Sequence, residues 1–234
     1  MTNDSLHEYL NILNLTRDYL TEGWEKRYDD VIPSSQDCVS EPWEEKKEEK
    51  AELSSIADEV SVCTRCRLAG SRTYAVPGEG TAEPKVMVIG EAPGAMEDES
   101  GRPFVGKAGK YLDKWLEAIG LSRERDVFIG NIIKCRPPNN RDPFLDEQEA
   151  CLPFLQRQMD ILKPFAILAV GRIATHILTG SEESMGRLHG RTLSYRGTPL
   201  IPTYHPSGVL RNPQYRKPVW EDLKKLKRLI DGGE

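Results

Sequence analysis

The sequence predicts an α/β protein: a three-layer α/β/α sandwich with a central, mainly parallel sheet of four strands, preceded by an N-terminal helical or disordered extension. Two observations lead to this prediction. Four short runs rich in Val and Ile have the nearly continuous apolar character of strands that are buried on both faces. The segments between them carry apolar residues at helical spacing. The expected strands lie at residues 85–90, 127–133, 165–171 and 199–204.

The helices between these strands are predicted from side chains that recur at intervals of three and four residues. One such face comprises Leu112, Trp115, Leu116 and Ile119, and another comprises Leu152, Leu155, Met159 and Leu162. The alternation of strands and helices implies βαβ units and therefore parallel strands. In such folds ligands bind at the carboxyl ends of the strands, so we expect the chemistry at that edge.

The first 60 residues differ in charge from the rest of the chain. They hold 16 of the 37 Asp and Glu and 6 of the 32 Lys and Arg, a net charge of -10, which leaves +5 on residues 61–234. Leu6, Leu10, Leu13 and Leu20 with Tyr9 predict a short amphipathic helix, and residues 32–50 read as a linker too polar to bury a core. We therefore expect an acidic extension over residues 1–60 and one domain over residues 61–234. The extension is either a solvated tail or a helix that docks on a partner protein.

Several classes of protein are excluded by motifs that are missing or misplaced. No apolar run approaches the roughly 20 residues of a membrane span, and no secretion signal opens the sequence, so we expect a cytoplasmic protein with no membrane partner. Gly78-Glu79-Gly80 precedes the first strand, whereas a dinucleotide-binding loop must follow one. Gly106-Lys107-Ala108-Gly109 lacks the magnesium-binding hydroxyl of a phosphate-binding loop. A basic domain remains compatible with nucleic-acid binding.

Polar or glycine-rich residues follow each of the four expected strands. The first strand leads into Gly90-Glu91-Ala92-Pro93-Gly94, and the others lead into residues 131–141, 171–172 and 205–213. Each feature alone has an ordinary explanation, because Asn131 can cap a turn, Glu91 can be solvated and His205 can be a satisfied loop histidine. Their expected placement at one edge of the sheet favours a functional site.

Four of the five cysteines suggest a metal centre. Cys63 and Cys66 have the spacing with which two thiolates grip one centre, and Cys135 and Cys151 would complete a set of four, while Cys38 lies in the linker. Without an export signal, disulfides are disfavoured. Zinc and an iron-sulfur cluster both accept four cysteines, and the spacing does not decide between them. Alternatively, Cys135 and Cys151 are small buried hydrophobic residues.

Taken together, the motifs resemble the family 4 uracil-DNA glycosylases, the iron-sulfur branch of the uracil-DNA glycosylase superfamily. The resemblance covers residues 61–230 and rests on residues 90–94, 97–98, 101–109, 131–141 and 205–207. It implies a structural 4Fe-4S cluster held by Cys63, Cys66, Cys135 and Cys151. It also implies a monofunctional enzyme, expected to be a monomer, that acts on uracil-containing DNA in base excision repair.

The resemblance further implies roles for individual residues. The enzyme flips the nucleotide out of the helix and hydrolyses its N-glycosidic bond, releasing uracil and leaving an abasic site. The catalytic candidates are Glu91, which would position the attacking water, and His205, which would donate a hydrogen bond toward O2 of the leaving uracil. The best-known members carry an aspartate where this sequence has Ala92, so Glu91 alternatively only shapes the pocket. The uracil-binding residues implied are Glu91, Ala92, Pro93, Phe104, Asn131 and His205.

Contacts with DNA are expected from the same loops. Leu210 is a candidate wedge into the vacated base stack, and the phosphate-contacting candidates are Lys107, Lys134, Arg136, Arg141 and Arg211. Some relatives in this superfamily carry a histidine-bearing insertion after the second strand and trap the abasic sugar covalently. This sequence has no such insertion, so the resemblance implies ordinary turnover. Two alternatives are a non-catalytic iron-sulfur DNA-binding module that recruits a repair or replication partner and a zinc-bearing nuclease.

Overall fold

The structure is a computed structural model that describes residues 42–232. The helix expected near Leu6 to Leu20 and the linker residue Cys38 lie outside the described residues. Between residues 42 and 232, no helix is both long enough and apolar enough to cross a membrane.

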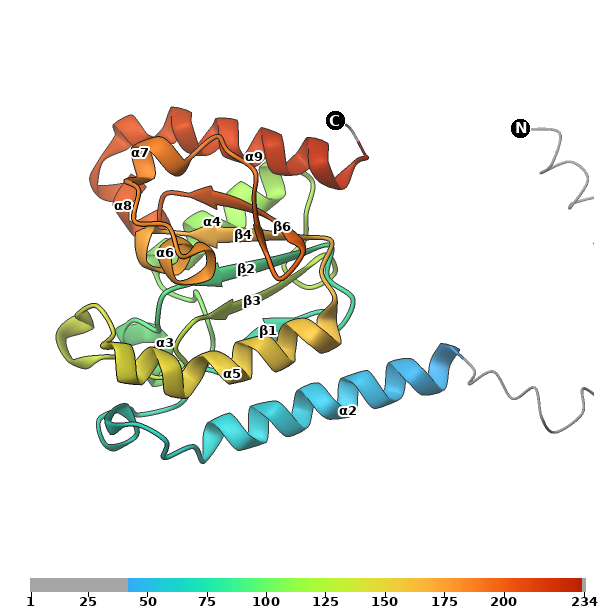
Figure 1. Cartoon of the computed structure of the whole chain (residues 1–234), viewed down its shortest axis with the longest axis vertical. Coiled ribbons are helices and arrows are strands. Elements are labelled where there is room, and N and C mark those ends of the chain that lie inside the picture. The colour runs from blue at the N-terminus through green and yellow to red at the C-terminus, as the bar shows by residue number, and fades with distance from the viewer. Residues whose placement is uncertain (1–41, 233–234) are drawn as a thin grey trace, which may run out of the picture. The chain divides into compact units, whose positions relative to one another are not determined.

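The core of the protein is a six-stranded sheet with the order β1-β3-β2-β4-β6-β5 (Figure 1). The four central strands, β3 (Val127–Asn131), β2 (Val86–Gly90), β4 (Ala166–Val170) and β6 (Thr198–Thr203), are parallel, as predicted. Two short strands, β1 (Glu79–Gly80) and β5 (Leu193–Tyr195), pair antiparallel with β3 and β6 at the edges. The prediction of four strands was therefore wrong in number. Strands of two and three residues are too short to produce a recognisable pattern.

Both faces of the sheet are covered, which explains the apolar character of its strands. All five residues of β2 are buried, and they alternate between two cores: Met87 and Ile89 belong to one, Val86 and Val88 to the other. The same alternation holds in β4. The sandwich therefore has the three layers that the sequence predicted.

Helices from different parts of the chain form the outer layers (Figure 1). The core on one side includes residues of α2 (Pro42–Ser61), α5 (Leu145–Leu162) and α6 (Arg172–Thr179), and the core on the other includes residues of α4 (Lys107–Ala118), α8 (Pro206–Arg211) and α9 (Arg216–Ile230). The shorter helices are α3 (Ala95–Ser100), α7 (Met185–Leu188) and the 3-10 turns η2 (Arg67–Gly70), η3 (Pro138–Asn140) and η4 (Pro213–Tyr215).

Helix α2 differs from the expected linker. Residues 42–50 were expected to be irregular, but they form the first half of this helix, which continues across the expected domain boundary at residue 60. Ile56 and Val60 are each only 1% exposed and pack in the core beside α5. Glu, Lys and Ala favour helices, and Pro42 stands at the first helical position, where proline is well tolerated. The helical spacing of Leu53, Ile56 and Val60 was the available signal in the sequence.

Candidate active site

The carboxyl ends of β2, β3, β4 and β6 bring the predicted polar residues to one place. A methyl group on Gly90 would lie 2.4 Å from Asn131 Oδ1 and 2.7 Å from Phe104 Cζ, so these side chains lie directly over the end of β2. The rings of Phe104 and His205 have centroids 5.8 Å apart and are inclined by 32°. Gly171, at the end of β4, adjoins His205, since a methyl group there would lie 3.1 Å from His205 Cβ. The site is thus walled by an aromatic ring, an amide and an imidazole.

Asn131 presents an unpaired acceptor to this site. It is the last residue of β3, pairs in register with Gly90, and is 1% exposed. Its Oδ1 is buried and has no hydrogen-bond partner among the described residues. Leaving a buried polar atom unsatisfied costs about 1–3 kcal/mol, so such atoms usually serve a purpose. The amide is therefore free to accept a hydrogen bond from a ligand in the site.

His205 is held as a neutral imidazole with a defined tautomer. It caps the N-terminus of α8, and its Nδ1 accepts a hydrogen bond from the Ser207 backbone N–H at 3.2 Å. Burial, assisted by the nearby Arg211, lowers the pKa of His205 to about 4. Because Nδ1 is an acceptor and the ring is neutral at pH 7, the ring proton resides on Nε2, where it is available as a donor.

Glu91 is an acid poised near neutrality. It follows β2 directly, and its backbone carbonyl accepts a hydrogen bond from Ile133 N at 3.0 Å, which ties it to the segment after β3. Burial raises the pKa of Glu91 to about 7; the charge of Asp142 adds to the rise and Arg172 opposes it. Asp142 and Arg172 are themselves paired at 3.0 Å. Sequence analysis placed Arg172 at the end of a strand without giving it a role, and it did not single out Asp142.

Ala92 and Pro93 follow Glu91 in the chain, and Phe104 lies over the end of β2. Ala92 packs against the core beside α5, and Pro93 is buried. Phe104 is 6% exposed and has a φ of 53°, the left-handed region that a bulky residue rarely occupies. Glu97 orders the loop that follows Phe104. The Oε1 atom of Glu97 accepts hydrogen bonds from the backbone N–H groups of Val105 and Gly106, both at 2.9 Å.

Three of the predicted DNA-contacting residues are exposed near the site. Lys107 is the first residue of α4, and Leu210 and Arg211 are the last two of α8. Leu210 is 44% exposed, so its side chain is accessible, as a wedge requires.

The other three basic candidates are engaged within the protein. Lys134 was wrongly expected to meet phosphate: it is 1% exposed, and its Nζ donates to Gln158 Oε1 at 2.8 Å. The sequence did not reveal which way this strand-end side chain points. Arg136 Nε donates to Asn140 Oδ1 at 2.8 Å. Arg141 donates to both carboxylate oxygens of Glu147 at 2.8 and 2.6 Å, so its availability to phosphate remains a prediction.

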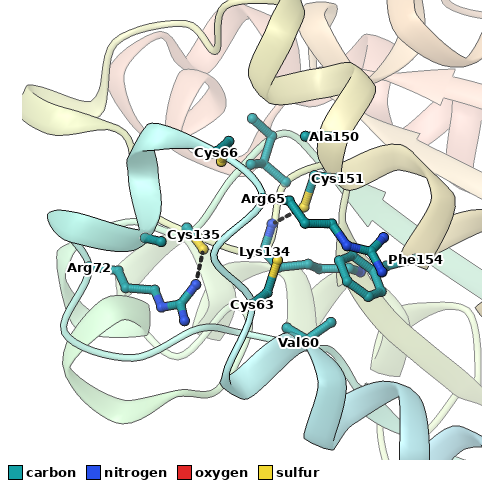
Figure 2. A pocket seen from close by; sticks show the side chains of 12 residues that line it. Val60, Cys63, Arg65, Cys66, Arg72, Lys134, Cys135, Ala150, Cys151 and Phe154 are labelled. Carbon is teal, nitrogen blue, oxygen red and sulfur yellow. Dashed lines mark hydrogen bonds between the residues drawn. The ribbon is translucent and has the colours of Figure 1, made fainter.

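The four cysteines predicted to act together line one small pocket (Figure 2). Cys63 and Cys66 follow α2, Cys135 follows β3, and Cys151 lies on α5. Two donors already point at sulfur atoms. Arg72 Nη1 lies 3.1 Å from Cys135 Sγ, and the Lys134 backbone N–H lies 3.2 Å from Cys151 Sγ. The two are drawn as dashed lines in Figure 2.

The chemistry of this pocket suits a bound cationic centre. Burial raises the pKa of Cys135 and raises that of Cys151 to about 11, so these buried thiols need a cationic centre to become thiolates. Among residues 42–232, no three His, Cys, Asp or Glu side chains converge closely enough to hold one metal ion.

Comparison with known proteins agrees with this geometry. Residues 77–224 match the family model described as the Uracil DNA glycosylase superfamily. The chain therefore belongs to the uracil-DNA glycosylase superfamily.

Curated relatives specify the branch. The chain is 48% identical over 187 residues to the type-4 uracil-DNA glycosylase of Saccharolobus solfataricus, covering 76% of this chain and 86% of that protein. Identity to the type-4 enzyme of Sulfurisphaera tokodaii is 47%, with 76% and 84% covered, and to that of Pyrobaculum aerophilum 44%, with 74% and 91% covered. These matches place it among the type-4 members of the superfamily.

Proposed function

We propose that the protein is a monofunctional uracil-DNA glycosylase of base excision repair, which hydrolyses the bond between uracil and deoxyribose in DNA. The unpaired Asn131 Oδ1 between Phe104 and the end of β2 carries the proposal. It offers an acceptor in a site with an aromatic wall and an imidazole donor, which is what a flipped uracil requires. The type-4 names of the relatives support the same reaction.

Base selection follows from the amide of Asn131. Its Oδ1 accepts the N3–H of uracil, and its Nδ2 donates to O4. Cytosine lacks the N3–H and carries an amino group in place of O4. Its N3 acceptor would therefore face the Oδ1 acceptor of Asn131, and its amino donor would face the Nδ2 donor. Phe104 provides the face on which the base stacks.

Bond cleavage uses His205 and Glu91. As the C1′–N1 bond breaks, its electron pair moves to the uracil ring, and the Nε2–H of His205 donates a hydrogen bond to O2, where negative charge accumulates. A water oxygen forms the new bond to C1′. Glu91 positions this water and takes its proton, which a carboxyl group with a pKa of about 7 can do at neutral pH. The departing uracil anion takes up a proton from solvent, so the products are free uracil and an abasic site.

DNA is held by the loops around the site in this proposal. The exposed Lys107 and Arg211 contact phosphates on either side of the flipped nucleotide, and Leu210 enters the vacated base stack. Arg136 and Arg141 also contact phosphates, while Asn140 orients Arg136 and Glu147 orients Arg141. We propose that the enzyme acts as a monomer in the cytoplasm.

Cys63, Cys66, Cys135 and Cys151 hold a structural 4Fe-4S cluster in this proposal. When bound, the cluster supplies cross-links among three segments of the chain rather than chemistry on the base. Purified protein should be brown and contain about four irons per chain. Stoichiometric zinc in a colourless, active protein would contradict this assignment.

The acidic N-terminal extension weakens non-specific DNA binding in this proposal. Because α2 begins at Pro42, the deletion that tests this should remove residues 1–41 and leave the helix intact. We expect tighter DNA binding at low salt and a smaller difference at high salt. Unchanged affinity for DNA would show that the charge of the extension does not affect DNA binding. The alternative role, docking on a partner protein, would then be favoured.

The decisive experiment uses an oligonucleotide with a single uracil. After incubation with the protein, alkali should cleave the strand at that position and free uracil should appear, while an otherwise identical cytosine strand stays intact. Strand cleavage before alkali treatment would indicate a nuclease. An intact uracil strand after alkali would favour the rival function, a non-catalytic iron-sulfur DNA-binding module.

A further inference from the structure

We propose that Arg123 is a positioning residue for base recognition: it locks the left-handed turn at Phe104 so that the ring is fixed as a stacking platform before uracil arrives. This inference rests on the proposed function, since it concerns the same pocket. No sequence motif marks Arg123, which lies in the connection between α4 and β3.

The backbone at Phe104 needs an explanation. Its φ of 53° is uncommon for any residue with a side chain and is an outlier for an aromatic one. Such conformations persist only where the surrounding structure over-determines them, and they concentrate at functional sites. The ring of Phe104 forms a wall of the candidate active site, so its strained backbone and its function coincide.

Arg123 holds the carbonyl side of this turn. Its Nη1 donates to Phe104 O at 3.1 Å, and its Nη2 donates to Pro103 O. The guanidinium is itself fixed by carboxylates: Glu79 Oε1 accepts from Nε at 3.0 Å and Asp113 Oδ1 accepts from Nη1 at 3.0 Å. With a side chain only 14% exposed, Arg123 is a rigid fork that grips two consecutive carbonyl groups.

The amide side of the turn is held independently. Glu97 accepts the N–H groups of Val105 and Gly106, as described above. Helix α4 closes the remaining direction, because a methyl group on Gly109 would lie 1.7 Å from Phe104 O. Phe104 is thus clamped by Arg123 before it, Glu97 after it and Gly109 beside it.

Release of the clamp would move the ring away from its working position. Phe104 Cζ lies over Gly90 and beside Asn131 Oδ1, where the base must stack and pair at the same time. A relaxed turn would leave Asn131 intact and leave the phosphate-binding loops in place. The defect should therefore appear in affinity for the base and be absent from affinity for the DNA backbone.

The test compares two ligands of the full-length protein: free uracil, measured as an inhibitor, and a duplex with an abasic-site analogue, which has no base to stack. In Arg123→Lys a single ammonium replaces the fork. We expect its inhibition constant for uracil to rise about tenfold, or about 1.4 kcal/mol, within the range of base–aromatic stacking. Its dissociation constant for the abasic duplex should stay within about twofold of wild type.

Arg102→Lys is the matched control. Arg102 also donates to Glu79, at 2.8 and 3.2 Å, but these hydrogen bonds do not involve the turn at Phe104. The inhibition constant of Arg102→Lys for uracil should therefore match that of wild type. A double-mutant cycle adds a second readout. In the Phe104→Leu background, Arg123→Lys should change uracil inhibition less than twofold, because the ring it positions is gone.

Three results would overturn the inference: unchanged uracil inhibition in Arg123→Lys, equal weakening of both ligands, or additive effects of Arg123→Lys and Phe104→Leu. If Arg123→Lys does not fold by circular dichroism, Glu79→Gln loosens the same guanidinium without touching the turn and should give a smaller change in the same direction. Failure of the proposed function would be seen separately, as a wild-type protein that excises no uracil.

Discussion

Replacement of Glu91 by glutamine should stabilise the protein at alkaline pH while it slows the reaction. Glutamine has the shape of a protonated glutamate and does not titrate. The pKa of Glu91 is raised from 4.5 to about 7, mainly by burial. At 1.36 kcal/mol per pH unit, keeping this group ionised in the folded state costs at most about 3 kcal/mol, because water partly screens it.

The sign of the effect follows from proton binding. Between pH 4.5 and 7 the folded protein binds more protons at Glu91 than the unfolded chain does, so the free energy of unfolding falls as pH rises through this window. Glu91→Gln lacks this loss. Its stability advantage over wild type should grow by about 2 kcal/mol between pH 5.5 and pH 8.5, measured by urea denaturation.

The same group should control the reaction rate. For wild type, kcat/KM should rise with pH to a plateau above about 7, as the Glu91 carboxylate forms. Glu91→Gln should be slower and lack this rise. Glu99→Gln, which removes an exposed carboxylate from α3, is the control and should behave as wild type in kcat/KM. A Glu91 variant with the full single-turnover rate and an unchanged pH profile would refute the assigned role.

Three further predictions concern the base, the wedge and the cysteines. Asn131→Leu removes the unpaired buried oxygen, so it should raise the free energy of unfolding by about 1 kcal/mol in urea denaturation while uracil excision is lost. A less stable variant would contradict the inference that this oxygen is unsatisfied. Leu210→Ala should lower duplex activity about tenfold relative to single-stranded activity in gel assays, within the few kcal/mol that base extrusion costs, and an equal effect on both substrates would exclude a wedge. If Cys151 binds the proposed cluster, Cys151→Ser should lower the iron content and the melting temperature together, whereas unchanged iron would remove Cys151 from the ligand set.

The sequence predicted those features that depend on local periodicity and on general rules of parallel sheets. The runs around Val86–Gly90 and Ala166–Val170 are apolar throughout because both faces are buried, so their parallel arrangement and shared edge could be inferred. That edge then brought Asn131 and His205 together without further information.

What the sequence did not reveal depends on side-chain direction and on contacts between distant segments. Lys134 follows a strand end, and its burial against Gln158 depends on the register of β3 and the position of α5. Arg123 contacts a turn 19 residues earlier in the chain, and no local pattern announces that contact. The edge strands β1 and β5 were not predicted because each is only two or three residues long and is defined by its pairing with β3 or β6.

The cysteine pocket also bears on how the chain folds. Its thiols come from two pairs, and Cys66 and Cys135 are separated by 69 residues. Closing a flexible loop of that length costs about 4 kcal/mol of chain entropy, beyond a length-independent constant. A centre bound to all four thiolates would offset this cost, because its binding free energy is gained as the chain folds. Refolding of the metal-free chain should therefore be slower at the step that joins α2 to α5, even where the parallel sheet itself forms at an unchanged rate.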